Sequence, residues 1–77
     1  MTSIEKITLE SSASLMDISA ILLNDCAVKS GLLSQHLPGL SDEDRAELQS
    51  QRDIQLGNAQ QLRANAANLR LIISQLL

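Results

Sequence analysis

The chain has 77 residues, of which 44% are hydrophobic, 19% are charged and none is aromatic, and its formal net charge is -3. A chain this short buries only roughly 60% of the surface that its unfolded form exposes. Because Phe, Tyr and Trp are absent, it also lacks the side chains that bury the most area. Six basic residues scattered among nine acidic ones leave no basic stripe for nucleic acid and no ring for base stacking. We therefore expect a small helical unit that is not an enzyme and whose core a protein partner or an oligomer completes.

The chain also lacks the signals of export. Its one cysteine, Cys26, has no internal disulfide partner, which fits a reducing cytoplasm. The first residues show neither the basic nor the apolar region of a signal peptide. No stretch reaches the roughly 20 apolar residues that cross a bilayer. These features predict a cytoplasmic protein without a membrane span.

The first predicted element is a helix of about residues 12–35. Two pairs resemble a capping box and compete for its start, Thr2 with Glu5 and Ser14 with Asp17. The Ser11-Ser12 pair between them indicates either a break or a polar helix face. We expect the helix to begin near Ser12, after a short helix or a mobile arm. Its apolar side chains form two lines, Ile18, Ile21, Val28 and Leu32 in one and Leu15, Leu22, Cys26 and Leu33 in the other.

A hinge of about residues 36–41 follows, because Pro38 and Gly39 interrupt the helical pattern. Ser41, with Asp44 three residues later, predicts the start of a second helix of about residues 42–76. A seven-residue repeat in this helix predicts a coiled-coil-like seam with polar interruptions, made of Leu48, Gln51, Gln55, Asn58, Leu62, Asn65, Leu69, Ile72 and Leu76. A flanking apolar line consists of Leu56, Ala59, Ala66, Ile73 and Leu77.

Two helices joined by a short hinge predict an all-α fold, an antiparallel two-helix hairpin that forms a single unit over residues 1–77. Two helices cannot enclose broad apolar faces on both arms, and an exposed apolar stripe usually marks a protein contact. We expect that surplus face between Leu62 and Leu77. The candidate partner-binding residues are Leu62, Asn65, Leu69, Ile72, Ile73 and Leu76. Packing of the same residues against the first helix is the alternative interpretation.

No residue pattern in the chain predicts catalysis, a metal site or a cofactor. His36 is the only histidine, and with Cys26 it is too isolated to hold zinc. We interpret His36 as a helix-end residue and Cys26 as a small apolar residue rather than a redox sensor. The acidic run after Ser41 is explained by the favourable field at a helix N-terminus.

The hairpin size, the Pro38-Gly39 hinge and the Leu-rich second helix with Asn and Gln at heptad spacing resemble the small helical chaperones of type III secretion. Needle-subunit co-chaperones are the nearest in size, and the stretch 58–77 is similar to the C-terminal helix of flagellar export chaperones. The resemblance implies a cytoplasmic protein that pairs with a helical-repeat chaperone and keeps a secreted subunit monomeric. A different expectation from the residues is a self-assembling homodimeric four-helix bundle or coiled-coil module.

Overall fold

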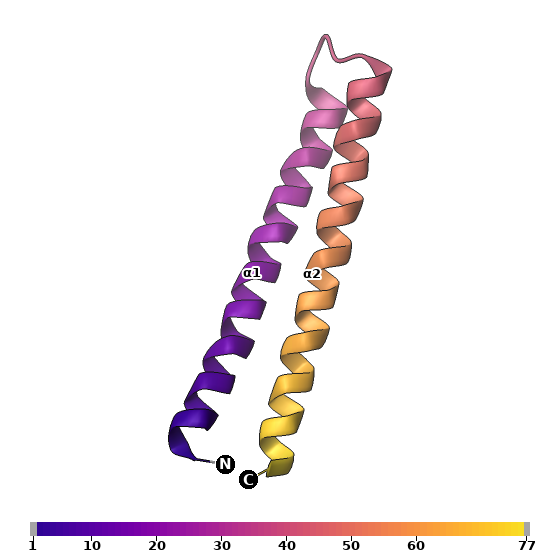
Figure 1. Ribbon diagram of the computed structural model, residues 1–77. Coiled ribbons are helices and arrows are strands. Elements are labelled where there is room, and N and C mark those ends of the chain that lie inside the picture. Colours follow the sequence, from indigo (N-terminus) through magenta and orange to yellow (C-terminus); the bar gives the residue numbers. More distant parts are fainter. Residues whose placement is uncertain (1, 77) are drawn as a thin grey trace.

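The computed structural model describes residues 2–76, which form two long antiparallel helices (Figure 1). Helix α1 comprises Ser3–His36 and helix α2 comprises Asp42–Leu76. They lie side by side along their whole length, so that the Cα atoms fill a rod of 57 × 14 × 11 Å. The predicted all-α helical hairpin is confirmed. Within the described range, neither helix has the length and apolar content needed to cross a membrane.

Helix α1 begins at Ser3, well before the start that we expected near Ser12. Of the two candidate capping boxes the structure uses the first, because the Thr2 hydroxyl accepts a 3.1 Å hydrogen bond from the backbone N–H of Glu5. The serines near position 12 do not break the helix. The Ser12 hydroxyl donates to the carbonyl oxygen of Thr8 at 3.0 Å, so it finds its partner inside the helix.

The connection between the helices turns at Pro38 and Gly39. Gly39 has φ 81°, the value that the third residue of a type II turn requires, and Pro38 precedes it at the position where proline is favoured. The Ser41 side chain then accepts a 3.1 Å hydrogen bond from the N–H of Asp44 and caps α2. The three acidic residues of the first turn, Asp42, Glu43 and Asp44, lie in the favourable field of this N-terminus.

The core of the hairpin is a line of small side chains at intervals of seven residues. On α1 it contains Ala13, Ala20, Ala27 and Ser34, and on α2 it contains Ala59, Ala66 and Ile73. We call these seven residues the alanine seam. Four of its alanines have no exposed surface and the fifth has 1%. Alanine at the contact lets two helix axes approach toward the short end of the usual distance of about 8–10 Å.

Larger side chains flank the alanine seam and are half-buried, among them Leu23 on α1 and Leu62 on α2. The Asp17–Arg70 ion pair of 2.6 Å and the packing of Arg52 on Gly31 set the register of the helices.

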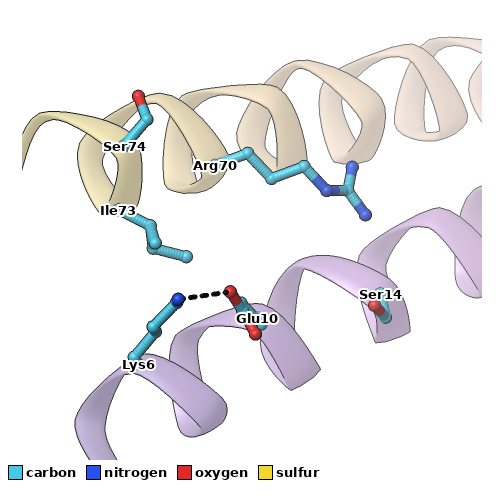
Figure 2. A pocket seen from close by; sticks show the side chains of 6 residues that line it. All are labelled: Lys6, Glu10, Ser14, Arg70, Ile73 and Ser74. Atoms are coloured by element: carbon cyan, nitrogen blue, oxygen red, sulfur yellow. Dashed lines mark ion pairs between the residues drawn. The ribbon is translucent and has the colours of Figure 1, made fainter. Parts of the chain in front are cut away.

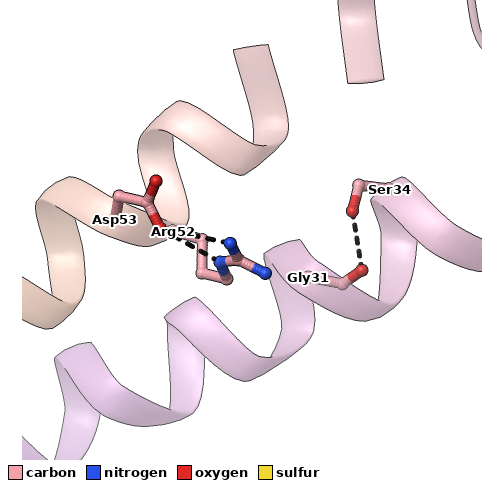
Figure 3. Close-up of polar contacts among 4 residues, drawn as sticks. All are labelled: Gly31, Ser34, Arg52 and Asp53. Carbon is pink, nitrogen blue, oxygen red and sulfur yellow. Dashed lines mark hydrogen bonds and ion pairs between the residues drawn. The ribbon is translucent and has the colours of Figure 1, made fainter. Parts of the chain in front are cut away.

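Toward the hinge the seam becomes polar, as Figure 3 shows. Ser34 is buried, and its hydroxyl donates to the carbonyl oxygen of Gly31 at 2.8 Å. The missing side chain of Gly31 leaves room for Arg52, whose Cδ would lie 3.3 Å from a Cβ at that position. The Arg52 guanidinium reaches outward to pair with Asp53 at 3.2 Å. The stem of Arg52 thus fills the interface while its charge stays at the surface.

We predict that Gly39→Ala lowers the free energy of unfolding by about 1–2 kcal/mol, because an L side chain strains the backbone at positive φ. The matched control is Gly57→Ala, since Gly57 lies in α2 and no atom is within 4 Å of an added Cβ. That substitution should raise stability by about 0.5–1 kcal/mol. Urea unfolding followed by circular dichroism measures both. Equal effects of the two substitutions would contradict this explanation of the turn.

We also predict that Ala20→Leu destabilises the hairpin by about 1–3 kcal/mol, because a larger side chain in the alanine seam forces the helices apart. Ala64→Leu on the exposed part of α2 should change stability by about 0.5 kcal/mol or less. The same unfolding measurement compares them. If Ala20→Leu were neutral, the helices would not depend on close approach at this position.

Candidate protein-binding surface

The face of α1 that points away from α2 is lined by large apolar side chains. Residues at alternating spacings of three and four form this line, which we call the outer seam: Ile4, Ile7, Ser11, Ser14, Ile18, Ile21, Asp25, Val28 and Leu32. Its apolar members are between 51% and 78% exposed. Leu15 and Leu22 lie beside it and are 63% and 61% exposed. Helix α1 therefore has two apolar faces, a narrow one of small residues against α2 and a broad one of large residues in solvent.

Charge is scarce on this surface. Asp25 lies in the outer seam, and its carboxylate accepts a 2.9 Å contact from the Lys29 ammonium one turn later. The hydrogen bond and the negative charge of Asp25 raise the pKa of Lys29, which stays protonated at neutral pH. Since each ion of this exposed pair neutralises the other, the middle of the seam carries little net charge.

The outer face of α2 is different in character. Its exposed positions are mostly polar or small, among them Ser50, Gly57, Gln61 and Asn68. The large apolar side chains that α2 exposes are Ile54, Leu71, Ile72 and Leu76. The surplus apolar surface of the hairpin is thus concentrated on α1, whereas our expectation from the sequence placed it on α2 between Leu62 and Leu77.

The structure divides the six residues that the sequence indicated as partner-binding. Leu62, Asn65 and Leu69 are half-buried and Ile73 is only 5% exposed, on the face that packs against α1. Ile72 and Leu76 are exposed, at 45% and 59%. Leu77, which we assigned to the flanking line, lies outside the described residues.

The predicted seam of α2 contained one correct line and one line displaced by a residue. Leu48, Gln55, Leu62 and Leu69 flank the interface as expected. The second line of the interface is Arg52, Ala59, Ala66 and Ile73 rather than Gln51, Asn58, Asn65 and Ile72. The alanines are small, so a search for large apolar residues placed them at the margin. Ala13, Ala20 and Ala27, spaced seven apart on the other arm, were the signal that would have corrected the choice.

Two polar side chains of the predicted seam, Gln55 and Asn65, are half-buried at the interface. Gln55 is half-buried, and its Oε1 has no hydrogen-bond partner within the described chain. An unsatisfied buried oxygen costs about 1–3 kcal/mol. Gln55 therefore places one unpaired polar oxygen in the hinge half of the hairpin interface.

Two shallow grooves run between the helices. The larger, of about 480 Å³, lies near the chain ends, where Figure 2 shows Ile73 pointing from α2 toward α1. Lys6 and Glu10 line its other side and form a 3.9 Å ion pair. The smaller groove, of about 220 Å³, lies beside Gly31 and Arg52. Both are open to solvent, and their charged groups are engaged in ion pairs at the helix surface.

The isolated titratable residues stay isolated in the fold. His36 is the last residue of α1, at the hinge end of the rod, and is exposed. Cys26 is a free, exposed thiol. The interpretation of Cys26 as a small apolar residue that packs on the helix face is therefore wrong. Among residues 2–76, no three His, Cys, Asp or Glu side chains cluster in a way that suits a metal ion.

Fold and surface together define a helical hairpin that displays an apolar helix face. Comparison of the chain with protein-family models, with characterised proteins and with solved structures finds no match.

We predict that Ile73→Asp destabilises the hairpin by about 2–5 kcal/mol, because it removes a buried isoleucine and places a charge against α1. The neighbouring substitution Ile72→Asp should cost about 1 kcal/mol or less, since that side chain is 45% exposed. Urea unfolding of both variants tests the assignment. The reverse order of effects would mean that α2 is rotated by about one residue from the register described above.

Proposed function

We propose that this chain is a non-enzymatic protein-binding module, a small cytoplasmic chaperone or co-chaperone that masks an apolar helix of a secreted or assembling subunit. The observation that carries the proposal is the outer seam of α1. Ile18 and Ile21 at its centre are 53% and 63% exposed, and Leu22 beside them is 61% exposed. Complete burial of a fully exposed side chain of this kind contributes about 1.5–3 kcal/mol, and these half-exposed side chains gain roughly half of that. A few of these anchors supply the affinity of a specific complex.

The geometry suits recognition of another helix. The apolar anchors recur at spacings of three, four and seven residues, which is how helices bind in grooves and along one another. The alanine seam closes the contact between α1 and α2 without using these anchors. The chain can therefore present the outer seam on a helix that is already formed, which lowers the entropic cost of binding.

The character of this surface supports a chaperone role. A subunit that assembles through an apolar helix needs that helix covered before assembly, and an apolar face of equal length on a small rigid hairpin can cover it. The resemblance to needle co-chaperones implies a secreted subunit as the client and a helical-repeat chaperone as a second partner. Of the six residues that the sequence indicated as partner-binding, Ile72 and Leu76 are exposed near the C-terminal end of α2 and are accessible to such a partner.

We predict that the double substitution Ile18→Asp and Ile21→Asp lowers partner capture about tenfold or more, because it places two charges in the centre of the contact. Tagged wild-type and variant chains are purified from the native host, and the proteins retained with each are compared by mass spectrometry. Ile54→Asp is the control, since it adds one such charge at an exposed isoleucine of α2.

A secretion-system or assembling subunit that is retained by the wild type and the control, but not by the double variant, supports the proposal. Circular dichroism checks that the double variant stays helical. Unchanged capture by this variant would move the binding surface away from α1. Retention of a metabolic enzyme alone would contradict the chaperone role.

A further inference from the structure

The outer seam has the spacing of a coiled-coil contact. From Ile4 to Leu32 its members alternate at three and four residues, which is the 3.5-residue period with which one helix packs along another. The alanine face of α1 already packs against α2. The outer seam is therefore a second packing face on α1. A helix that is apolar on two sides is normally enclosed on both.

The exposed area of the hairpin indicates how much surface a further partner would bury. The hairpin exposes 5424 Å². A compact monomer of 8.3 kDa exposes about 4,600 Å² by the usual scaling. The surplus of about 800 Å² equals the share that one partner buries in a standard stable interface. One contact of ordinary size along α1 would thus bring the chain to the exposure of a compact protein.

We propose that a second copy of this chain covers the outer seam, with the two α1 helices antiparallel about a two-fold axis. In this arrangement α1 of each copy lies at the centre of a four-helix dimer and α2 lies outside. This order places the apolar helix inside and the helix with the polar outer face in solvent. The inference rests on the proposed function in that it assigns an occupant to the same surface.

The residues of the seam are self-complementary in one antiparallel register. With the axis near Ser19 and Ala20, Ile18 of one copy lies level with Ile21 of the other. At the two ends of the contact, Ile7 lies level with Leu32. The remaining carboxylate, Asp25, lies level with Ser14, whose hydroxyl can donate a hydrogen bond to it. Apolar residues thus meet apolar ones at the centre and near both ends.

Other arrangements of the same helices are less favourable. A parallel pair places the two Asp25 side chains at one site and desolvates both of their ion pairs with Lys29 there. A shift of seven residues in one direction brings Ile21 opposite Asp25, and a shift in the other direction brings Ile7 opposite it. Each shift buries the Asp25–Lys29 ion pair against an isoleucine, which offers no hydrogen bond to compensate the lost water, and this is costly. Asp25 therefore selects both the orientation and the register.

The dimer has a consequence for partner capture. Because the second copy and a client helix use the same seam, the client must displace the second copy in order to bind. Self-association then keeps the apolar face covered while no client is present. A client binds only if its affinity for the outer seam exceeds that of the second copy at the concentrations present.

The first test is sedimentation equilibrium of the purified chain at micromolar concentration. We expect twice the 8.3 kDa chain mass for the wild type and for Ile54→Asp. Ile18→Asp with Ile21→Asp should give the mass of a single chain and retain its helical circular dichroism. A monomeric wild type, or an assembly larger than two chains, would overturn the proposal.

The second test measures orientation and uses variants that keep the centre of the seam intact. The exposed native thiol is first removed by Cys26→Ser, and Ile7→Cys and Leu32→Cys are then made in separate chains, one of them carrying a tag. A short bis-maleimide should link the two chains when they are mixed and should link neither variant to itself. Self-linking of each variant alone would show a parallel dimer, and absence of any link would contradict the register.

The two proposals fail in different ways. If the wild type is monomeric but the seam variant still loses its client, the dimer is wrong and the protein-binding function stands. If the wild type is an antiparallel dimer and no client depends on the seam, the heteromeric function is wrong and the self-assembly stands.

Discussion

The close contact of two helices through alanine is the interaction on which the rest of this structure depends. Alanine at intervals of seven residues lets the backbones approach, and the neighbouring Leu23 and Leu62 fill the space beside it. Such a contact is narrow. It buries the alanines of α1 and leaves its isoleucines and most of its leucines exposed to solvent.

Different residues of the hairpin therefore provide its stability and its binding surface. The alanine seam and the hinge hold the hairpin, whereas the outer seam contributes little to the contact between α1 and α2. Substitutions at the outer seam can therefore alter association without removing the fold, which is the property that a binding surface on so small a chain requires. Polar residues affect the two contacts differently. Gln55 places an unpaired oxygen beside the alanine seam, and Asp25 in the outer seam restricts how a further helix can pack.

Much of the fold follows from local signals in the sequence. Pro38 and Gly39 locate the turn, and Ser41 with its acidic neighbours locates the start of α2, because backbone geometry and capping act over only a few residues. The start of α1 was misjudged for the same reason. Two capping boxes were available, and Ser12 can either cap a helix or bond to the preceding turn within one. Local chemistry alone did not choose between them.

The position of the candidate binding surface, in contrast, could not be predicted from local signals. Periodicity alone indicates which residues share a helix face, but it does not say which face meets the neighbouring helix when a helix has two apolar faces. The large residues Ile18, Ile21 and Leu22 resemble core more than Ala20 does, and sequence reasoning accordingly favoured large residues for packing and placed the surplus on α2.

An antiparallel helical hairpin with more apolar surface than two helices can bury is predictable without coordinates, because turn residues and caps act locally and the apolar content is read directly from the chain. Which surface is left over depends on how the two helices pack. The reason is steric: the pair of faces that lets the helices approach most closely is the pair lined by alanine, and that choice depends on both helices together.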